Sequence, residues 1–149
     1  MFRPTAILVP TDFSHPSDKA LEEALDIARQ YTAKVHLVHV IPQDLDYMCS
    51  VDYCMDAGTI QQLTDQALLG AAESLQKQLK KFPLAQGVNV VTEVRKGHPA
   101  DEILKVQEEK GIDLIVMAPL GRTGISKFLL GSVTNNVIKT ARSLVLLVR

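Results

Sequence analysis

Short apolar segments alternate with longer amphipathic segments along the whole chain, and this alternation constrains the fold more than any other feature. Strand-like segments, mostly almost continuously apolar, cover residues 5–12, 34–42, 88–94, 112–119 and 143–149. Apolar residues recur at helical spacing in residues 14–32, 59–81, 97–111 and 132–140. Strands of this kind are typical of parallel sheets that are covered on both faces. The order predicts a single doubly wound, Rossmann-like α/β domain over residues 1–149, with a five-stranded parallel sheet flanked by four helices.

Residues that favour helix ends mark several of these boundaries. Ser14 and Ser17 are candidate N-caps of the first helix. Thr59 followed by Gln62 resembles a capping box, so the second helix is expected to begin there. Residues 43–58 show no period, and we expect a loop or a short helix over the rim of the domain.

The composition argues against several classes of partner. The formal net charge of −1 gives no overall attraction to nucleic acid or to an anionic membrane. No apolar run approaches the length of a membrane span, and the run at residues 6–9 is too short for the core of a signal peptide. Two cysteines are too few for a disulfide framework, so we expect a reducing, cytoplasmic location.

The fold class predicts where a ligand would bind. Open parallel sheets bind ligands at the carboxyl ends of their strands, where the strand order reverses. If the chain starts in the middle of the sheet, Asp12 after the first strand lies beside the loop at 118–132 after the fourth. Glycines let that loop approach an anion closely, and Gly131 with Ser132 opens a helix whose N-terminus favours phosphate. Asp12 suits a ribose hydroxyl or an amino group, because its charge would repel phosphate.

The same loop also has an ordinary structural interpretation. Glycines after a strand are common in connections, and Ser132 can simply be a helix N-cap. A Walker A loop requires a glycine directly before its lysine, and Lys127 has none. The dinucleotide fingerprint belongs after the first strand, whereas this loop follows the fourth. On spacing alone, a structural loop is favoured over phosphate binding.

Several stretches of the chain match one protein family. The chain resembles the universal stress protein family along nearly its full length, in ILVPTDFS, HVIP, GHPADEIL and DLIVMAPLGRTGISKFLLGSVTNNVI. Nucleotide-binding members of that family carry G-x2-G-x9-G-[ST] after the fourth strand. In this chain Ala118, Gly121, Gly131 and Ser132 occupy the motif positions. The resemblance implies the fold of the adenine nucleotide alpha hydrolase-like proteins.

The resemblance also implies a ligand and its site. Asp12 would hold the nucleoside, and Pro10 and Thr11 would shape the pocket. Val40 would offer backbone hydrogen bonds to adenine. The expected ligand is ATP, or else ADP or AMP, with or without Mg²⁺. The other implied site residues are Met117, Ala118, Gly121, Arg122, Gly131, Ser132 and Val133.

One departure from the family pattern affects this expectation. Ala118 stands at the first glycine of the motif, and Pro119 follows it. If that glycine requires a positive φ, alanine costs on the order of 1 kcal/mol. Proline also removes one backbone N–H, and Leu120 is apolar where a polar residue is common in the family. We expect binding to survive, weakened or shifted to a smaller adenine nucleotide.

Other candidate groups carry weaker expectations. His36 and His39 lie three residues apart on one strand, so they point to opposite faces and cannot share a metal. Cys49 and Cys54 lack the C-x2-C spacing of a zinc site, and a rim segment is favoured over a metal or redox site. His15 is a weak candidate contact of the predicted pocket.

Three functions remain open at this point. The first is an ATP-binding regulatory module of the stress response, read by an unknown protein partner. The second is a nucleotide-free interaction protein of the same fold, and the third is a weak ATPase. Catalytic motifs such as G-x-S-x-G and H-E-x-x-H are missing, so at most slow ATP hydrolysis is expected. The resemblance also implies a homodimer through the last strand, from Leu144 to Val148.

Overall fold

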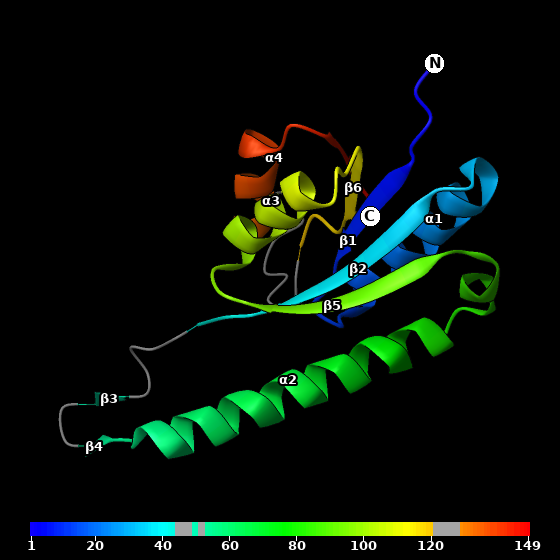
Figure 1. Cartoon of the computed structure of the whole chain (residues 1–149). Coiled ribbons are helices and arrows are strands. Elements are labelled where there is room, and N and C mark those ends of the chain that lie inside the picture. Colours follow the sequence, from blue (N-terminus) through cyan, green and yellow to red (C-terminus); the bar gives the residue numbers. More distant parts are fainter. Residues whose placement is uncertain (44–48, 51–52, 121–128) are drawn as a thin grey trace.

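A five-stranded parallel sheet forms the centre of the molecule. The computed structural model describes residues 1–43, 49–50, 53–120 and 129–149 (Figure 1). The strands run in the order β5-β2-β1-β6-β7, and every pair of neighbours is parallel. Their bounds are β1 Ala6–Pro10, β2 Lys34–Ile41, β5 Val90–Lys96, β6 Leu114–Met117 and β7 Leu144–Leu147. The predicted fold class is confirmed.

Four helices cover the two faces of this sheet. They are α1 His15–Tyr31, α2 Ala57–Lys80, α3 Pro99–Glu109 and α4 Ser132–Thr140. Two smaller features were not predicted: a 3-10 helix at Pro83–Gly87, and a short hairpin of β3 Cys49–Ser50 and β4 Tyr53–Cys54. The hairpin lies beyond the sheet, at the N-terminal end of α2 (Figure 1).

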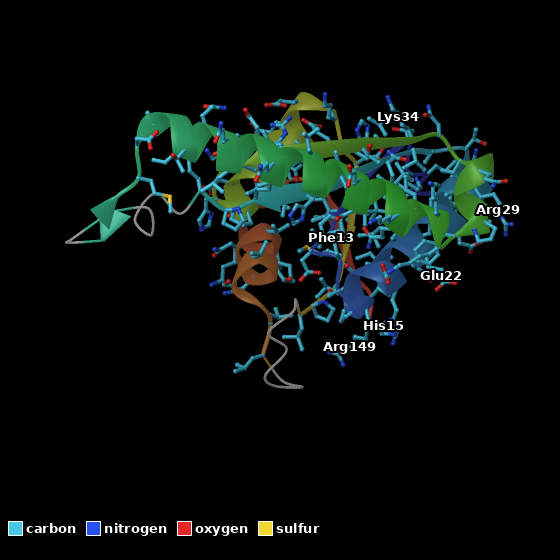
Figure 2. The ribbon with its side chains drawn as sticks, turned by 90° about the horizontal axis from the view of Figure 1, so that it is seen from below. Phe13, His15, Glu22, Arg29, Lys34 and Arg149 are labelled. Atoms are coloured by element: carbon cyan, nitrogen blue, oxygen red, sulfur yellow. The ribbon has the colours of Figure 1, made fainter. Side chains whose placement is uncertain are left out.

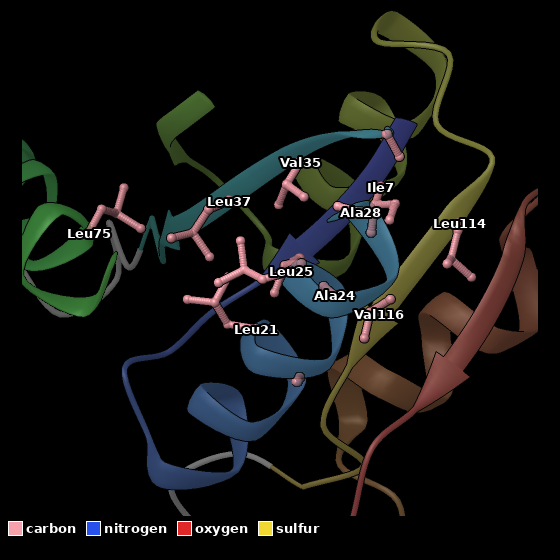
Figure 3. Packing of buried hydrophobic residues seen from close by; sticks show 13 residues of the cluster. Ile7, Leu21, Ala24, Leu25, Ala28, Val35, Leu37, Leu75, Leu114 and Val116 are labelled. Atoms are coloured by element: carbon pink, nitrogen blue, oxygen red, sulfur yellow. The ribbon is translucent and has the colours of Figure 1, made fainter. Parts of the chain in front are cut away.

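Alternate residues of β1 enter two separate core clusters. Ile7 and Val9 are fully buried with α1 and with Leu75 of α2 (Figure 3). Leu8, also fully buried, packs on the opposite face with Ile103 of α3. Burial of one such side chain stabilises the fold by about 2 kcal/mol. Because β1 has apolar residues for both faces, it can occupy the middle of the sheet.

The strand order reverses at β1, as the sequence predicts. Leu8 pairs in register with His36 of β2 on one side and with Ile115 of β6 on the other. The chain therefore leaves β1 toward one edge of the sheet and later returns to build the other. The carboxyl ends of β1 and β6 are neighbours, which is the geometry that favours a ligand cavity.

The predicted start of α2 is wrong by a few residues. Asp56 is the N-cap, and its carboxylate accepts hydrogen bonds from the backbone N–H and the hydroxyl of Thr59, at 2.9 and 2.7 Å. These bonds hold the pKa of Asp56 below its usual value. An aspartate caps a helix as well as a threonine does, so the first available cap starts the helix. None of the described helices combines the length and the apolarity that a membrane crossing needs.

Candidate functional site

A cavity of about 480 Å³ opens at the carboxyl ends of β1, β2 and β6. Of the eleven predicted site residues, nine line it: Pro10, Thr11, Asp12, Val40, Met117, Ala118, Gly131, Ser132 and Val133. Gly121 and Arg122 lie outside the described residues. The cavity is also lined by Ser17, Val38, His39, Pro42, Pro99, Ile103, Leu120 and Thr134. The topology therefore brings together residues that are more than a hundred positions apart in the sequence.

The turn after β1 is held by its own hydrogen bonds. The Thr11 hydroxyl accepts a bond from the N–H of Phe13 at 3.1 Å, and Phe13 has a left-handed φ of 64°. The Asp12 Oδ1 atom accepts bonds from the N–H of Ser14, at 3.0 Å, and from the Ser14 hydroxyl. Ser14 in turn caps α1 by accepting a bond from the N–H of Ser17, as predicted. Asp12 is thus fixed by a rigid turn between a central strand and a helix.

A buried glutamine connects this turn to α2. The Thr11 hydroxyl lies 2.9 Å from Oε1 of Gln78, which is only 2% exposed. The amide of Gln78 donates to Oδ1 of Asp18 at 2.8 Å, and Lys81 binds the other carboxylate oxygen of Asp18. The sequence did not reveal this contact, because Thr11 and Gln78 are 67 residues apart.

His39 supports the same turn from β2. Its Nδ1 atom lies 2.7 Å from the carbonyl oxygen of Thr11, and its ring stacks against Phe13 with a centroid distance of 4.5 Å. A carbonyl oxygen only accepts hydrogen bonds, so Nδ1 carries the proton. Sequence reasoning missed this residue, because a strand histidine has no distinctive local signal. His15, the weak candidate, is exposed on the first turn of α1 and does not line the cavity (Figure 2).

The N-terminus of α4 forms another part of the cavity wall. Gly131 rather than Ser132 is the N-cap, and no side chain of the described residues caps the helix. The N–H of Gly131 donates to the carbonyl of Pro119 at 2.9 Å, which holds the helix start beside β6. The first N–H groups of a helix have no intrahelical acceptor, and they carry a partial positive charge. An anion at this end of the cavity would accept hydrogen bonds from these N–H groups of α4.

Ala118 does not have the positive φ that would make alanine costly at this position. Within the described part of the chain, Phe13 and Thr32 are the only non-glycine residues with a positive φ. Ala118 therefore has an ordinary backbone conformation, so replacing the motif's glycine with alanine causes no strain from a positive φ. Its carbonyl accepts a hydrogen bond from the Thr134 hydroxyl at 3.0 Å, which ties the end of β6 to α4. The departure from the family motif is accommodated without distortion.

The remainder of the described wall is mostly apolar. Val38, Val40 and Met117 are at most 8% exposed, and Ile103 of α3 is 2% exposed. Asp12 is the one carboxylate among the described lining residues, and none of them is a lysine or an arginine. Such a wall suits an uncharged, flat ring system, with polar recognition concentrated at the β1 turn and at the start of α4.

Comparison with known proteins decides the family. The sequence model of the Universal stress protein family matches residues 4–149. The chain belongs to the universal stress protein family. Universal stress protein MJ0531 of Methanocaldococcus jannaschii is 36% identical over 143 residues, which cover 96% of this chain and 81% of that protein.

Solved structures of universal stress proteins share the fold over full length. The structure of MJ0577, a protein of the same archaeon, is 31% identical with a TM-score of 0.82, and the match covers 99% of this chain and 96% of that chain. The UspA protein of Lactobacillus plantarum is 26% identical, also with a TM-score of 0.82, and both chains are covered completely.

Two more distant neighbours are complexes with nucleotides. One is a universal stress protein in complex with cAMP, 21% identical with a TM-score of 0.68, covering 99% of this chain and 98% of that chain. The other, from Archaeoglobus fulgidus, is in complex with dAMP, 21% identical with a TM-score of 0.59, covering 99% and 100%. At this identity the similarity to this chain is one of fold.

Proposed function

We propose that this protein binds an adenine nucleotide in the cavity and acts as a nucleotide-dependent module of the stress response in the cytoplasm. The observation that carries the proposal is that Asp12 and the start of α4 at Gly131 border one largely apolar cavity. A carboxylate accepts hydrogen bonds from ribose hydroxyls, and a helix N-terminus binds phosphate. A nucleotide carries both groups on a flat ring, so it complements all parts of this wall.

The proposal assigns roles to the residues around the cavity. Val40 and Met117 would contact the adenine ring, with hydrogen bonds from the backbone of Val40. Pro10 and Thr11 would shape the nucleoside pocket around Asp12. The phosphate path would be formed by Ala118, Gly121, Arg122, Gly131, Ser132 and Val133.

The number of phosphates is part of the proposal. ATP is the expected ligand, with Mg²⁺ held by phosphate oxygens, and ADP and AMP are the smaller candidates. The cAMP and dAMP complexes of the two distant family members support a nucleotide with one phosphate as an alternative. Arg122 would add a positive charge for further phosphates.

Calorimetric titration of the purified chain tests the proposal. ATP, ADP and AMP would be titrated with and without Mg²⁺, and cAMP would be included. We expect saturable one-to-one binding of at least one of them. Absence of heat with all four, from a folded protein, would overturn the proposal and favour the nucleotide-free interaction protein.

A substitution at the helix start tests where the phosphate binds. Gly131→Val would place a branched side chain against the first N–H groups of α4. Gly131 has a φ of −59°, which valine can adopt, so the fold is expected to persist. Affinity should fall at least tenfold, about 1.4 kcal/mol. Gly87→Val in the 3-10 turn, where an added Cβ meets nothing within 4 Å, is the matched control. Equal affinity of the two variants would contradict the placement.

The same protein can be tested for ATP hydrolysis. Phosphate release that disappears in both Asp12→Asn and Ser132→Ala would favour the weak ATPase. Binding without phosphate release would favour the regulatory module. These two outcomes distinguish hydrolysis from binding, because titration measures binding independently.

We also propose that the chain forms a homodimer through its last strand, from Leu144 to Val148. β7 is at the edge of the sheet, and Leu144 and Leu146 on it are 55% and 37% exposed. Exposed apolar residues on an edge strand favour pairing with another strand. Leu146→Lys should convert a dimer to a monomer in light scattering, whereas Leu69→Lys on the exposed side of α2 should not. A monomeric wild-type chain would refute the dimer.

A further inference from the structure

Helix α2 extends past the sheet that it covers (Figure 1, Figure 2). Its 24 residues span about 36 Å, whereas the 7 residues of the edge strand β5, against which it packs, span about 23 Å. The buried residues of α2 are Ala71, Leu75 and Gln78, all in its second half. Residues 57–70, every one of them described, include no buried residue. The first half of α2 is therefore at least partly open to solvent on every side.

One side of α2 carries apolar and small residues in this region. They are Leu63, Ala67, Gly70 and Ser74, at the spacings of three and four residues that place side chains on the same side of a helix. Leu63 is 42% exposed, and Ala67 and Gly70 are also exposed. Glycine is unfavourable inside a helix, and a Cβ added at Gly70 would meet nothing within 4 Å, so the packing of this chain does not require it. Glycine would allow the backbone of another helix to approach closely.

The charges of α2 and its caps divide between the two halves of the helix. Residues 56–68 contain Asp56 and Asp65 and no lysine or arginine, so their net charge is −2. Residues 69–81 have a net charge of +2, from one glutamate and three lysines: Glu73, Lys77, Lys80 and Lys81. Two copies of the helix packed antiparallel place each negative half against the positive half of the other, whereas a parallel pair places like charges together. The charge pattern is therefore self-complementary only in the antiparallel arrangement.

We propose that this side of α2 binds the same side of α2 in a second copy of the chain, with the two helices antiparallel. A two-fold axis between residues 68 and 69 places Ala67 opposite Gly70 of the partner subunit. The same surface then serves both copies, as a two-fold interface requires. At the two ends, Asp56 lies opposite Lys81 of the partner subunit, and the Lys81 side chain is 55% exposed. Apolar and small residues in the middle and opposite charges at the ends thus match in one arrangement.

The size and place of this surface set the strength of the contact. One helix side per copy is a small interface, and interfaces below about 1,200 Å² are typical of weak complexes. α2 packs beside β5, at the opposite edge of the sheet from β7, so the contact can join two dimers that are formed through β7. None of the described cavity residues lies on α2, so the contact does not depend on nucleotide binding. We expect association in the high micromolar range.

Sedimentation equilibrium of the full chain tests the proposal, with Leu146→Lys as the background that removes pairing through β7. At low micromolar concentration this variant is expected to be a monomer, and at high micromolar concentration it should approach a dimer. Gly70→Gln should weaken that association at least tenfold, because a longer side chain keeps the two helices apart. Leu69→Gln changes the adjacent residue, which lies on a different side of α2 and is 69% exposed, so this matched control should leave the association unchanged. A monomer at every concentration, or equal effects of the two glutamines, would overturn the proposal.

Reversal of charge separates antiparallel self-pairing from other effects of substitution. Lys77→Glu with Lys80→Glu makes the second half of α2 negative, and Gln62→Lys with Asp65→Lys makes the first half positive. These positions are exposed, so both proteins should fold, but each would place like charges opposite each other and associate more weakly than the Leu146→Lys parent. Mixed, the two proteins bring opposite charges together at both ends, so the mixed dimer should be at least tenfold tighter than the dimer of either protein alone. A mixture that associates no better than its components would refute the antiparallel pairing.

Discussion

The bridge from Gln78 to the β1 turn allows a quantitative test of what holds the candidate site in place. Gln78→Leu keeps the approximate size of a side chain that is 2% exposed, and it removes both hydrogen bonds. A neutral bond to Thr11 contributes about 1 kcal/mol, and a bond to the carboxylate of Asp18 about 2 kcal/mol. Burial of the leucine recovers about 1 kcal/mol. The expected loss in the free energy of unfolding is therefore about 2 kcal/mol.

Urea denaturation and thermal melting measure this loss. For a chain of 149 residues, about 2 kcal/mol corresponds to a decrease in Tm of roughly 4–8 °C. Gln76→Leu is the matched control: the amide of Gln76 donates to the Thr92 hydroxyl at 3.2 Å in an exposed position. Substitutions of that kind change stability by no more than about 0.5 kcal/mol. If Gln78→Leu is as mild as this control, the bridge does not stabilise the fold.

A double-mutant cycle isolates the bond between Gln78 and Thr11. Thr11→Val removes the same hydroxyl from the other side, so the double variant should be less destabilised than the sum of the two single changes. We expect a coupling energy of about 1 kcal/mol. Strict additivity would mean that the effect of Gln78→Leu comes from Asp18 and packing alone. Folding of Thr11→Val must be confirmed first, because Thr11 also accepts the N–H of Phe13.

Two further predictions concern pH and backbone conformation. Burial lowers the pKa of His36 below 6.5, the charges of Lys34 and Lys110 lower it further, and the Nδ1 atom has no hydrogen-bond partner among the described residues. The unfolded chain therefore binds the proton more readily than the folded chain, so the free energy of unfolding should fall as the pH decreases below about 6.5. His36→Leu should flatten this dependence, which urea titrations at pH 7 and pH 5.5 measure. Gly97 has a φ of 151°, and an added Cβ would lie 3.0 Å from the buried Glu102, so Gly97→Ala should lower the free energy of unfolding by about 1–3 kcal/mol. A melting temperature equal to that of the wild type would refute the second prediction, and an unchanged pH profile in His36→Leu would refute the first.

The sheet and the location of the cavity could be predicted from the sequence because they depend on local periodicity and on topology. The apolar run at residues 6–9 indicated a buried strand, and a doubly wound fold places its first strand in the middle of the sheet. Once that strand is central, the residues that follow it must lie beside those that follow β6. Nine of the predicted site residues line the cavity for this reason.

The details that were missed depend on long-range or very short-range information. The contact of Gln78 with Thr11 joins residues on different elements, and no periodicity shows which polar residue of a helix faces the core. The strands at Cys49–Ser50 and Tyr53–Cys54 have two residues each, too few for an alternating pattern. Gly131 replaced Ser132 as the cap of α4, although serine is the stronger local signal.

The hydrogen bonds around the β1 turn bear on how tightly a ligand can bind. The Asp12 carboxylate accepts a hydrogen bond from the N–H of Ser14. The N–H of Thr11 donates to the carbonyl of Val38, and the carbonyl of Thr11 accepts a bond from Nδ1 of His39. These bonds are made between groups of the protein itself and hold this side of the cavity in place, which lowers the entropic cost of binding there. Phe13, with its left-handed φ of 64°, stores strain that the same bonds offset. Gln78 supports the same turn through its bond with the Thr11 hydroxyl and does not line the cavity. Gln78→Leu should therefore weaken the proposed nucleotide binding without removing a cavity residue, and titration of this variant beside its denaturation curve measures that effect.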